Sequence, residues 1–220
     1  MFILKEPNWV IRKISNPTNV KKIYLTFDDG PCPINTPAVL DLLKKHNSTA
    51  TFFVIGSKVL SNISLVQSMI QYGHEVLSHS KDHSYSNYFK AIPIIQRWIS
   101  TSISELNQLA AINKTGFRPP AGILNPPLVA AAKNLHVPLI LWNHRFYDTV
   151  SSLSRKKIDK KMPKINSGDI ILLHDHQKEK NKANFLFCLE YLILELKKRD
   201  FQIIALSQAD ILSACSFKND

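Results

Sequence analysis

The chain alternates short apolar runs with segments of helical periodicity, and this order constrains its fold more than any other feature. Parallel strands need crossover helices between them, so the alternation predicts an α/β fold with a parallel sheet. It fits both an open doubly wound sheet and a closed barrel. The expected strands are seven runs, six of them followed by a helical segment: Ile23–Phe27, Ala50–Gly56, His74–His79, Thr115–Pro120, Val137–Trp142, Asp169–His174 and Phe201–Leu206.

Two of the expected helices have clear start signals. Thr36 is expected to cap the helix over Thr36–His46, with Pro37 in its first turn, and Asn125 to cap the segment Asn125–His136. A chain of 220 residues without an internal repeat is expected to form one domain. Further helical segments are expected over Lys58–Tyr72, Tyr88–Ala111, Ser154–Lys161 and Ala183–Arg199.

Cysteine usage and the N-terminal sequence bear on the cellular compartment. The three cysteines, Cys32, Cys188 and Cys215, are odd in number and far apart, so they predict neither a disulfide framework nor a cysteine zinc site. The start lacks the apolar region and cleavage site of a secretory signal, and no apolar run is long enough to span a membrane. We therefore expect a cytoplasmic protein, with the inner membrane face and the cell envelope as alternatives.

The chain is strongly basic, with 28 Lys and Arg against 17 Asp and Glu and a formal net charge of +11. Such a charge favours anionic partners, and it is densest at 155–164, 178–182 and 197–199. Solvated helix faces and loop tips are the preferred explanation of these runs. No aromatic residue interleaves the densest run, so nucleic acid is not the expected partner. Contact of the basic surface, or of residues 1–14, with an anionic membrane or glycan stays open.

Polar side chains follow the expected strands at their carboxyl ends, where barrels and open α/β sheets build their active sites. They are Asp28 and Asp29 after the first run, His79 and His83 after the third, Arg118 at the fourth, Asp148 beyond the fifth and His174 after the sixth. Any one of these could occur by chance, and Asp-Gly-Pro alone is ordinary turn chemistry. Together they predict an active site on one rim.

Two histidines and one aspartate of this rim are candidate metal ligands. His79 and His83 are four residues apart, which aligns them on one face if the turn is helical. Asp29 would complete a set of three protein ligands, as in catalytic zinc sites, although the same set suits non-haem iron. A cation on Asp29 would neutralise that carboxylate, and Asp28 could then stay ionised beside it and act as a general base.

Four motifs, "TFDDGP", "HSKDH", "FRPPAG" and "LLHD", resemble the successive motifs of the polysaccharide deacetylase (NodB-homology, carbohydrate esterase 4) family, in the same order. The resemblance runs from about Ile23 to about Leu206. It implies a distorted single-domain (β/α) barrel with parallel strands, seven to eight units in all, and metal-dependent removal of N-acetyl groups from sugars such as N-acetylglucosamine. We expect a catalytic domain over 23–210, an N-terminal extension over 1–22 and a C-terminal tail over 211–220.

The resemblance also implies roles for individual residues. Asp28 becomes the base, Asp29, His79 and His83 the ligands of a divalent metal, and His174 the acid that protonates the departing amine. Zn²⁺ is the first choice of metal, with Co²⁺, Ni²⁺, Mn²⁺ and Fe²⁺ as alternatives. The remaining assignments are Arg118 to hold Asp28, Asp148 to tune His174, Ser80 to steady the ligand loop, the Ala121 N–H to stabilise the oxyanion, and Pro119, Gly122, Trp142 and Leu172 to contact substrate.

The sequence departs from the family pattern at three positions. Ala121 stands where the third motif usually has Tyr, so an aromatic wall is lost. Thr149 replaces a Trp after Asp148, and Arg145 occupies a position that is acidic in some members. These changes leave the base, the ligands and the acid in place and place the substrate preference in question.

Three other readings remain. One is hydrolysis of a different carbon–nitrogen bond, as in the cyclic imide or allantoin branch that resembles this family. Another is removal of an acyl or formyl group from a lipid-linked sugar at the inner membrane face. The last is a non-catalytic protein that binds glycan or nucleic acid, which the retained base, ligands and acid argue against.

Overall fold

A parallel sheet forms the centre of the molecule in the computed structural model, which describes residues 9–15 and 19–215. The long strand β2 (Lys22–Gly30) lies in the middle of the order β4 (Glu75–Ser78), β3 (Thr51–Val54), β2, β7 (Ile170–His174), β6 (His144–Arg145), and β8 (Gln202–Ile204) also pairs with β2. All of these pairings are parallel. The predicted parallel α/β class is confirmed.

Short pairings close this sheet into a barrel. Phe117 makes parallel bridges to Ser78 at the end of β4 and to Leu139 in β5 (Leu139–Ile140). β5 leads through residues 141–143 into β6, which pairs with β7. The ring therefore returns to β2, and the expected distorted barrel is confirmed. A further strand, β1 (Val10–Ile11), pairs with β5.

The run Thr115–Pro120, one of the seven strand candidates, forms only isolated bridges and no strand. Phe117 makes isolated bridges there, and a 3₁₀ turn, η3 (Pro120–Gly122), follows directly. Pro119 and Pro120 have no N–H to donate to a ladder, so the strand cannot extend. Sequence patterning also missed β1 and β6, which are two residues long each.

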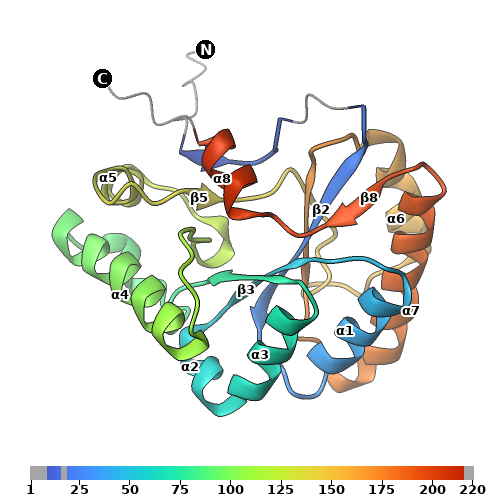
Figure 1. The fold of residues 1–220 in the computed structure, drawn as a ribbon, viewed down its shortest axis with the longest axis horizontal. Helices are drawn as coiled ribbons and strands as arrows, with labels where there is room; N and C mark the ends of the chain where they lie inside the picture. Colours follow the sequence, from blue (N-terminus) through green and yellow to red (C-terminus); the bar gives the residue numbers. More distant parts are fainter. Residues whose placement is uncertain (1–8, 16–18, 216–220) are drawn as a thin grey trace.

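Helices surround the strands, with α1, α3, α6 and α7 covering one part of the sheet and α4 and α5 another (Figure 1). Asn125 caps α5 as expected, because its side chain accepts from the Leu128 N–H at 3.0 Å. Thr36 does not cap α1; Asn35 is the N-cap and Thr36 is the first helical residue. The helices are α1 (Thr36–Lys45), α2 (Gly56–Val59), α3 (Ile63–Gln71), α4 (Ile92–Ala110), α5 (Pro126–Asn134), α6 (Arg155–Lys161), α7 (Glu179–Lys197) and α8 (Gln208–Ala214), with 3₁₀ turns η1 (Leu60–Asn62), η2 (Ser86–Phe89) and η4 (Met162–Lys164).

Successive side chains of a strand alternate between the barrel interior and the helix layer, and this alternation positions the site. Tyr24 of β2 and Ile170 of β7 belong to the interior apolar cluster, whereas Leu25 and Ile171 pack toward the helices. Following the inward row along β2 leads from Tyr24 to Thr26 and Asp28. The barrel interior thus delivers polar groups at the carboxyl end of the strands.

The described parts of the predicted extension and tail pack onto the domain. Val10, Ile11 and Ile14 are buried, and α8 continues past residue 210 with Ile211 in the interior cluster. The domain bounds themselves stay predictions, and residues 1–8 of the segment proposed to contact a membrane lie outside the described residues. Within the described residues, no helix is both long and apolar enough to cross a membrane.

Candidate active site

A β-bulge at Asp29 turns two neighbouring carboxylates into one pocket. The register of β2 against β3 shifts between Asp28 and Gly30, and Asp29 has a φ of 71°. Neighbouring side chains in a regular strand point to opposite faces, and a bulge changes where the extra residue points. Asp28 and Asp29 therefore line the same pocket. This accounts for the adjacent acidic pair in "TFDDGP".

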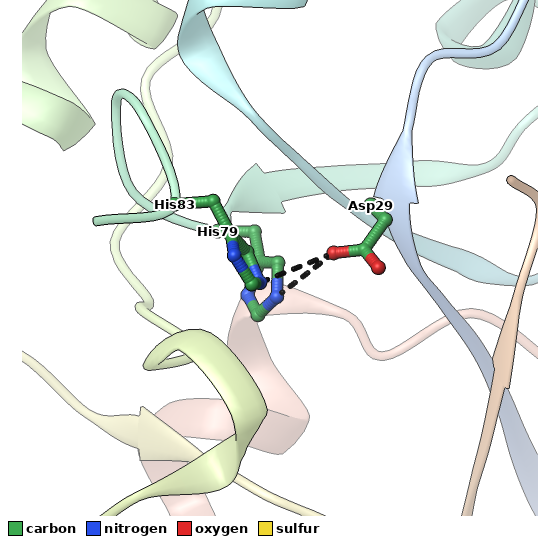
Figure 2. Close-up of side chains that lie close together, drawn as sticks. All are labelled: Asp29, His79 and His83. Atoms are coloured by element: carbon green, nitrogen blue, oxygen red, sulfur yellow. Dashed lines mark ion pairs between the residues drawn. The ribbon is translucent and has the colours of Figure 1, made fainter. Parts of the chain in front are cut away.

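Asp29, His79 and His83 come together as a candidate metal centre. The Oδ1 atom of Asp29 lies 3.5 Å from His79 Nε2 and 3.3 Å from His83 Nε2 (Figure 2). One ligand atom from each residue falls within 4.8 Å of the others. The three sequence-predicted ligands are therefore grouped as a shared site requires.

The loop between the two histidines is not helical, so their four-residue spacing does not bring them together as it would on a helix. Ser80 and His83 both adopt left-handed backbone conformations, with φ values of 69° and 57°. The buried Ser80 hydroxyl accepts from the His83 N–H at 2.9 Å, which closes the loop. The two imidazole rings meet because of this turn, with centroids 5.1 Å apart.

The donor atoms of this cluster fit a divalent cation. Asp29 Oδ1 is buried and has no hydrogen-bond partner. His79 Nδ1 lies 2.8 Å from the Arg118 carbonyl oxygen. A carbonyl can only accept, so Nδ1 carries the proton and the Nε2 lone pair faces Asp29.

Asp28 is held by a fully buried arginine. Arg118 Nη1 donates to Asp28 Oδ1 at 2.6 Å and to Thr26 Oγ1 at 2.8 Å. The other guanidinium donors bind the carbonyl oxygens of Ile140 and Leu141, and the group stacks 3.7 Å above the Phe53 ring centroid. These contacts fix the guanidinium, and its Nη1 in turn orients the Asp28 carboxylate.

His174 and Asp148 form a second charged pair in the site. His174 Nδ1 lies 3.0 Å from Asp148 Oδ1, and the backbone N–H of His174 donates to Asp148 Oδ2 at 2.8 Å. Gln177 Nε2 also donates to Asp148. Burial lowers the pKa of His174, but the hydrogen bond and charge of Asp148 outweigh burial, so this pKa is raised. Such an imidazole is suited to donate a proton near neutral pH.

A pocket of about 170 Å³ connects these groups. The predicted substrate residues Ala121, Trp142 and Leu172 line it, while Pro119 and Gly122 lie outside its lining. Gly122 instead packs under Trp142, where a Cβ would come within 2.4 Å of the ring. The other lining residues are Asp28, Asp29, His79, His83, Tyr85, Arg145, Thr149 and His174.

Sequence reasoning missed two residues that support the site, Asp175 and Tyr85. Asp175 is fully buried behind Gly30, and its carboxylate accepts from the Thr36 hydroxyl. Burial raises the pKa of Asp175 to about 7. Tyr85 packs edge-on against the His83 ring at 5.3 Å and supplies an aromatic wall although residue 121 is Ala. Asp175 stands next to His174 in the chain, but no spacing rule marks Tyr85.

Comparisons with known proteins agree with this geometry. A family model described as polysaccharide deacetylase matches residues 15–140. A peptidoglycan-N-acetylglucosamine deacetylase of Bacillus cereus is 30% identical over 204 residues, which is 87% of this chain and 89% of that protein. A chitooligosaccharide deacetylase of Bradyrhizobium is 29% identical over 208 residues, covering 90% of this chain and 95% of that protein.

Solved structures show the same architecture. The Xyl-CE4 domain of a multidomain xylanase, from the hindgut metagenome of Trinervitermes trinervoides, superimposes with a TM-score of 0.76 at 29% identity. The similarity covers 89% of this chain and 91% of that domain.

Proposed function

This chain belongs to the polysaccharide deacetylase family, and we propose that it is a metal-dependent hydrolase that removes N-acetyl groups from an amino-sugar substrate. Enzymes of this family act on carbon–nitrogen bonds other than peptide bonds. The names of its relatives point to peptidoglycan or chitin-like N-acetylglucosamine as the substrate class.

One observation carries the proposal. The three-residue ligand set lies in the same pocket as a carboxylate base held by arginine and an imidazole held by carboxylate. Amide hydrolysis needs these three parts, since water must be activated, the carbonyl polarised and the amine protonated. A binding protein on the same barrel would need none of them.

Asp28 is the proposed general base. It accepts a proton from water while the water oxygen forms a bond to the acyl carbon. Arg118 orients this carboxylate through its 2.6 Å contact. His174 is the proposed general acid. It donates a proton to the amine nitrogen as the carbon–nitrogen bond breaks. Acetate and a free amine then leave, and the two residues exchange their protons with solvent.

Asp29, His79 and His83 would hold the metal. When bound there, a divalent metal supplies Lewis acidity that lowers the pKa of water and polarises the acyl carbonyl. We propose Zn²⁺, since two imidazoles and one carboxylate with an open position are typical of catalytic zinc. Co²⁺, Ni²⁺, Mn²⁺ and Fe²⁺ accept the same donors. The Ala121 N–H is proposed to donate a hydrogen bond to the developing oxyanion. Removing one such donor costs about 2.7–4 kcal/mol in comparable sites.

The test measures acetate release from N-acetylglucosamine oligomers together with metal content per chain. We expect turnover by the metal-loaded protein, loss of turnover with a chelator and recovery when metal is restored. His83→Gln should lose metal and activity together. His46→Gln, which changes a histidine paired with Glu190 at 2.9 Å outside the site, should keep both.

Metal-loaded protein that turns over no N-acyl sugar would contradict the proposal. The substrate panel should also include the alternative substrates: a cyclic imide, allantoin and an N-formylated lipid-linked amino sugar. Activity confined to one of these would keep the metal chemistry and replace the substrate.

A further inference from the structure

Arg145 brings a positive charge into the active-site pocket. It lies in β6, where it pairs in register with Leu172 of β7, two residues before His174. Its guanidinium group stacks over Tyr147 at 4.2 Å and lies 5.7 Å from the Trp142 ring centroid. Arg145, Trp142 and His174 all line the pocket. The two aromatic rings therefore hold the planar group at the wall of the site.

The Arg145 side chain has no counter-ion within residues 9–15 and 19–215. Its Nε atom is buried without a hydrogen-bond partner, and no carboxylate among the described residues forms an ion pair with it. The neighbouring charges are already matched, because Asp28 pairs with Arg118 and Asp148 with His174. A cation held by Asp29, as proposed above, would make the pocket more positive still. An unmatched, partly buried guanidinium is costly unless a ligand supplies its partner.

The surface that continues from the pocket is also basic. A neighbouring groove of about 520 Å³ shares Asp29 and Thr149 with the active-site pocket and is lined further on by Lys178 and Lys180. Beyond Val150 and Ser151 lies another hollow, which is lined by Lys157, Lys160, Lys161 and Lys164. A glycan chain that leaves the pocket in this direction would run past positive side chains.

We propose that Arg145 is a specificity residue that binds a carboxylate or phosphate group of the substrate, so that acidic amino-sugar glycans are preferred over neutral ones. This inference rests on the proposed deacetylase function. A guanidinium that lies over an aromatic ring still presents its N–H donors as a planar fork, which matches the two oxygens of a carboxylate or phosphate. The small Thr149 leaves the pocket continuous with the basic groove.

The test compares matched glycans that differ in one charged group. The carboxylate probe is a peptidoglycan glycan strand without peptides, and its neutral partner is the same strand after reduction of the carboxyl groups. A phosphorylated N-acetylglucosamine oligomer and its unphosphorylated form provide the phosphate arm. Each is assayed for kcat and KM with the native protein, Arg145→Gln and Arg145→Lys, and with Arg97→Gln as the matched control on the exposed face of α4.

We expect Arg145→Gln to lower kcat/KM about 10- to 100-fold for the acidic member of a pair, mainly through KM, and to leave the neutral member within about twofold. Arg145→Lys should recover part of the loss, because it keeps the charge without the fork. Arg97→Gln should change neither member. The preference of the native protein should also shrink as salt is raised.

A binding measurement separates failure of this inference from failure of the proposed function. Calorimetric titration of the four probes into Asp28→Asn and Asp28→Asn/Arg145→Gln proteins requires no turnover. Tighter binding of the acidic probes that disappears with Arg145 supports the inference even if no substrate is hydrolysed. Equal binding of acidic and neutral probes overturns it, as does an equal loss of kcat for both members, which would place Arg145 at the reacting carbonyl instead.

Discussion

The Arg118 carbonyl oxygen accepts a hydrogen bond from His79 Nδ1 at 2.8 Å, which ties the arginine to a proposed metal ligand. The guanidinium of the same arginine donates to Asp28 at 2.6 Å. Its backbone thus orients a ligand while its side chain orients the base. A mutation at Arg118 therefore removes the side-chain contact to Asp28 and leaves the backbone contact to His79.

Asp28→Asn should abolish most of the activity and leave the metal in place. The amide cannot take up a proton as a carboxylate does, so kcat should fall about 10²- to 10⁴-fold. Acetate release and metal content per chain are the two measurements. Asp41→Asn, an exposed position on α1, is the matched control and should match the native protein in both. Loss of metal in Asp28→Asn would assign Asp28 to the ligand set.

Arg118→Met should destabilise the protein, because Asp28 would be left as a buried charge without its partner. Breaking a buried ion pair in this way costs about 3–5 kcal/mol in the free energy of unfolding. Urea denaturation measures the loss. The double variant Arg118→Met/Asp28→Asn removes the orphaned charge and should recover part of it; if it is no more stable than Arg118→Met, the pair is not the source.

Asp148→Asn should move the alkaline limit of activity to lower pH. Burial lowers the pKa of His174, and the hydrogen bond and charge of Asp148 more than offset it. Without that carboxylate the imidazole loses its proton at lower pH, and the general acid is lost there. The pH profile of kcat/KM measures the shift, with Asp200→Asn, whose side chain is 89% exposed, as control. An unmoved alkaline limb would contradict the assignment of His174 as the acid tuned by Asp148.

Asp175→Asn should flatten the dependence of stability on pH. Burial raises the pKa of Asp175 from 3.8 to about 7, so between these values the folded state keeps a proton that the unfolded chain has lost. In the native protein, protonated Asp175 contributes its full share to the free energy of unfolding below about pH 4. This contribution is lost as pH rises through about 7. Unfolding of both proteins from pH 5 to 8 is the measurement. Parallel curves would show that Asp175 does not titrate in this window.

Much of the site could be predicted because its parts sit at strand ends. Alternating runs placed Asp28, Asp29 and His174 at the carboxyl ends of β2 and β7, where register later brought them together. The structure groups His79 and His83, which the sequence predicts as a pair, but not by the helical alignment that their spacing allows. They meet through a left-handed turn closed by Ser80 and not through a helical one.

What the sequence did not reveal depends on contacts between distant segments. The bulge at Asp29 is a register shift between two strands, and the Asp175 contact joins the end of β7 to the start of α1 across 139 positions. Two-residue strands such as β6 carry no periodicity. The position of Arg145 in the pocket comes from β6 pairing with β7, so the sequence marked the residue as unusual without locating it.

The two separate contacts of Arg118 have an evolutionary consequence. Any residue at 118 offers a backbone carbonyl to His79, but arginine alone offers the guanidinium that holds Asp28. If Asp29, His79 and His83 hold a metal as proposed, replacing Arg118 would leave the backbone contact that orients His79 and remove the side-chain contact that orients the proposed base. A homologue without arginine at this position would then keep the proposed ligands and lack the support of the proposed base.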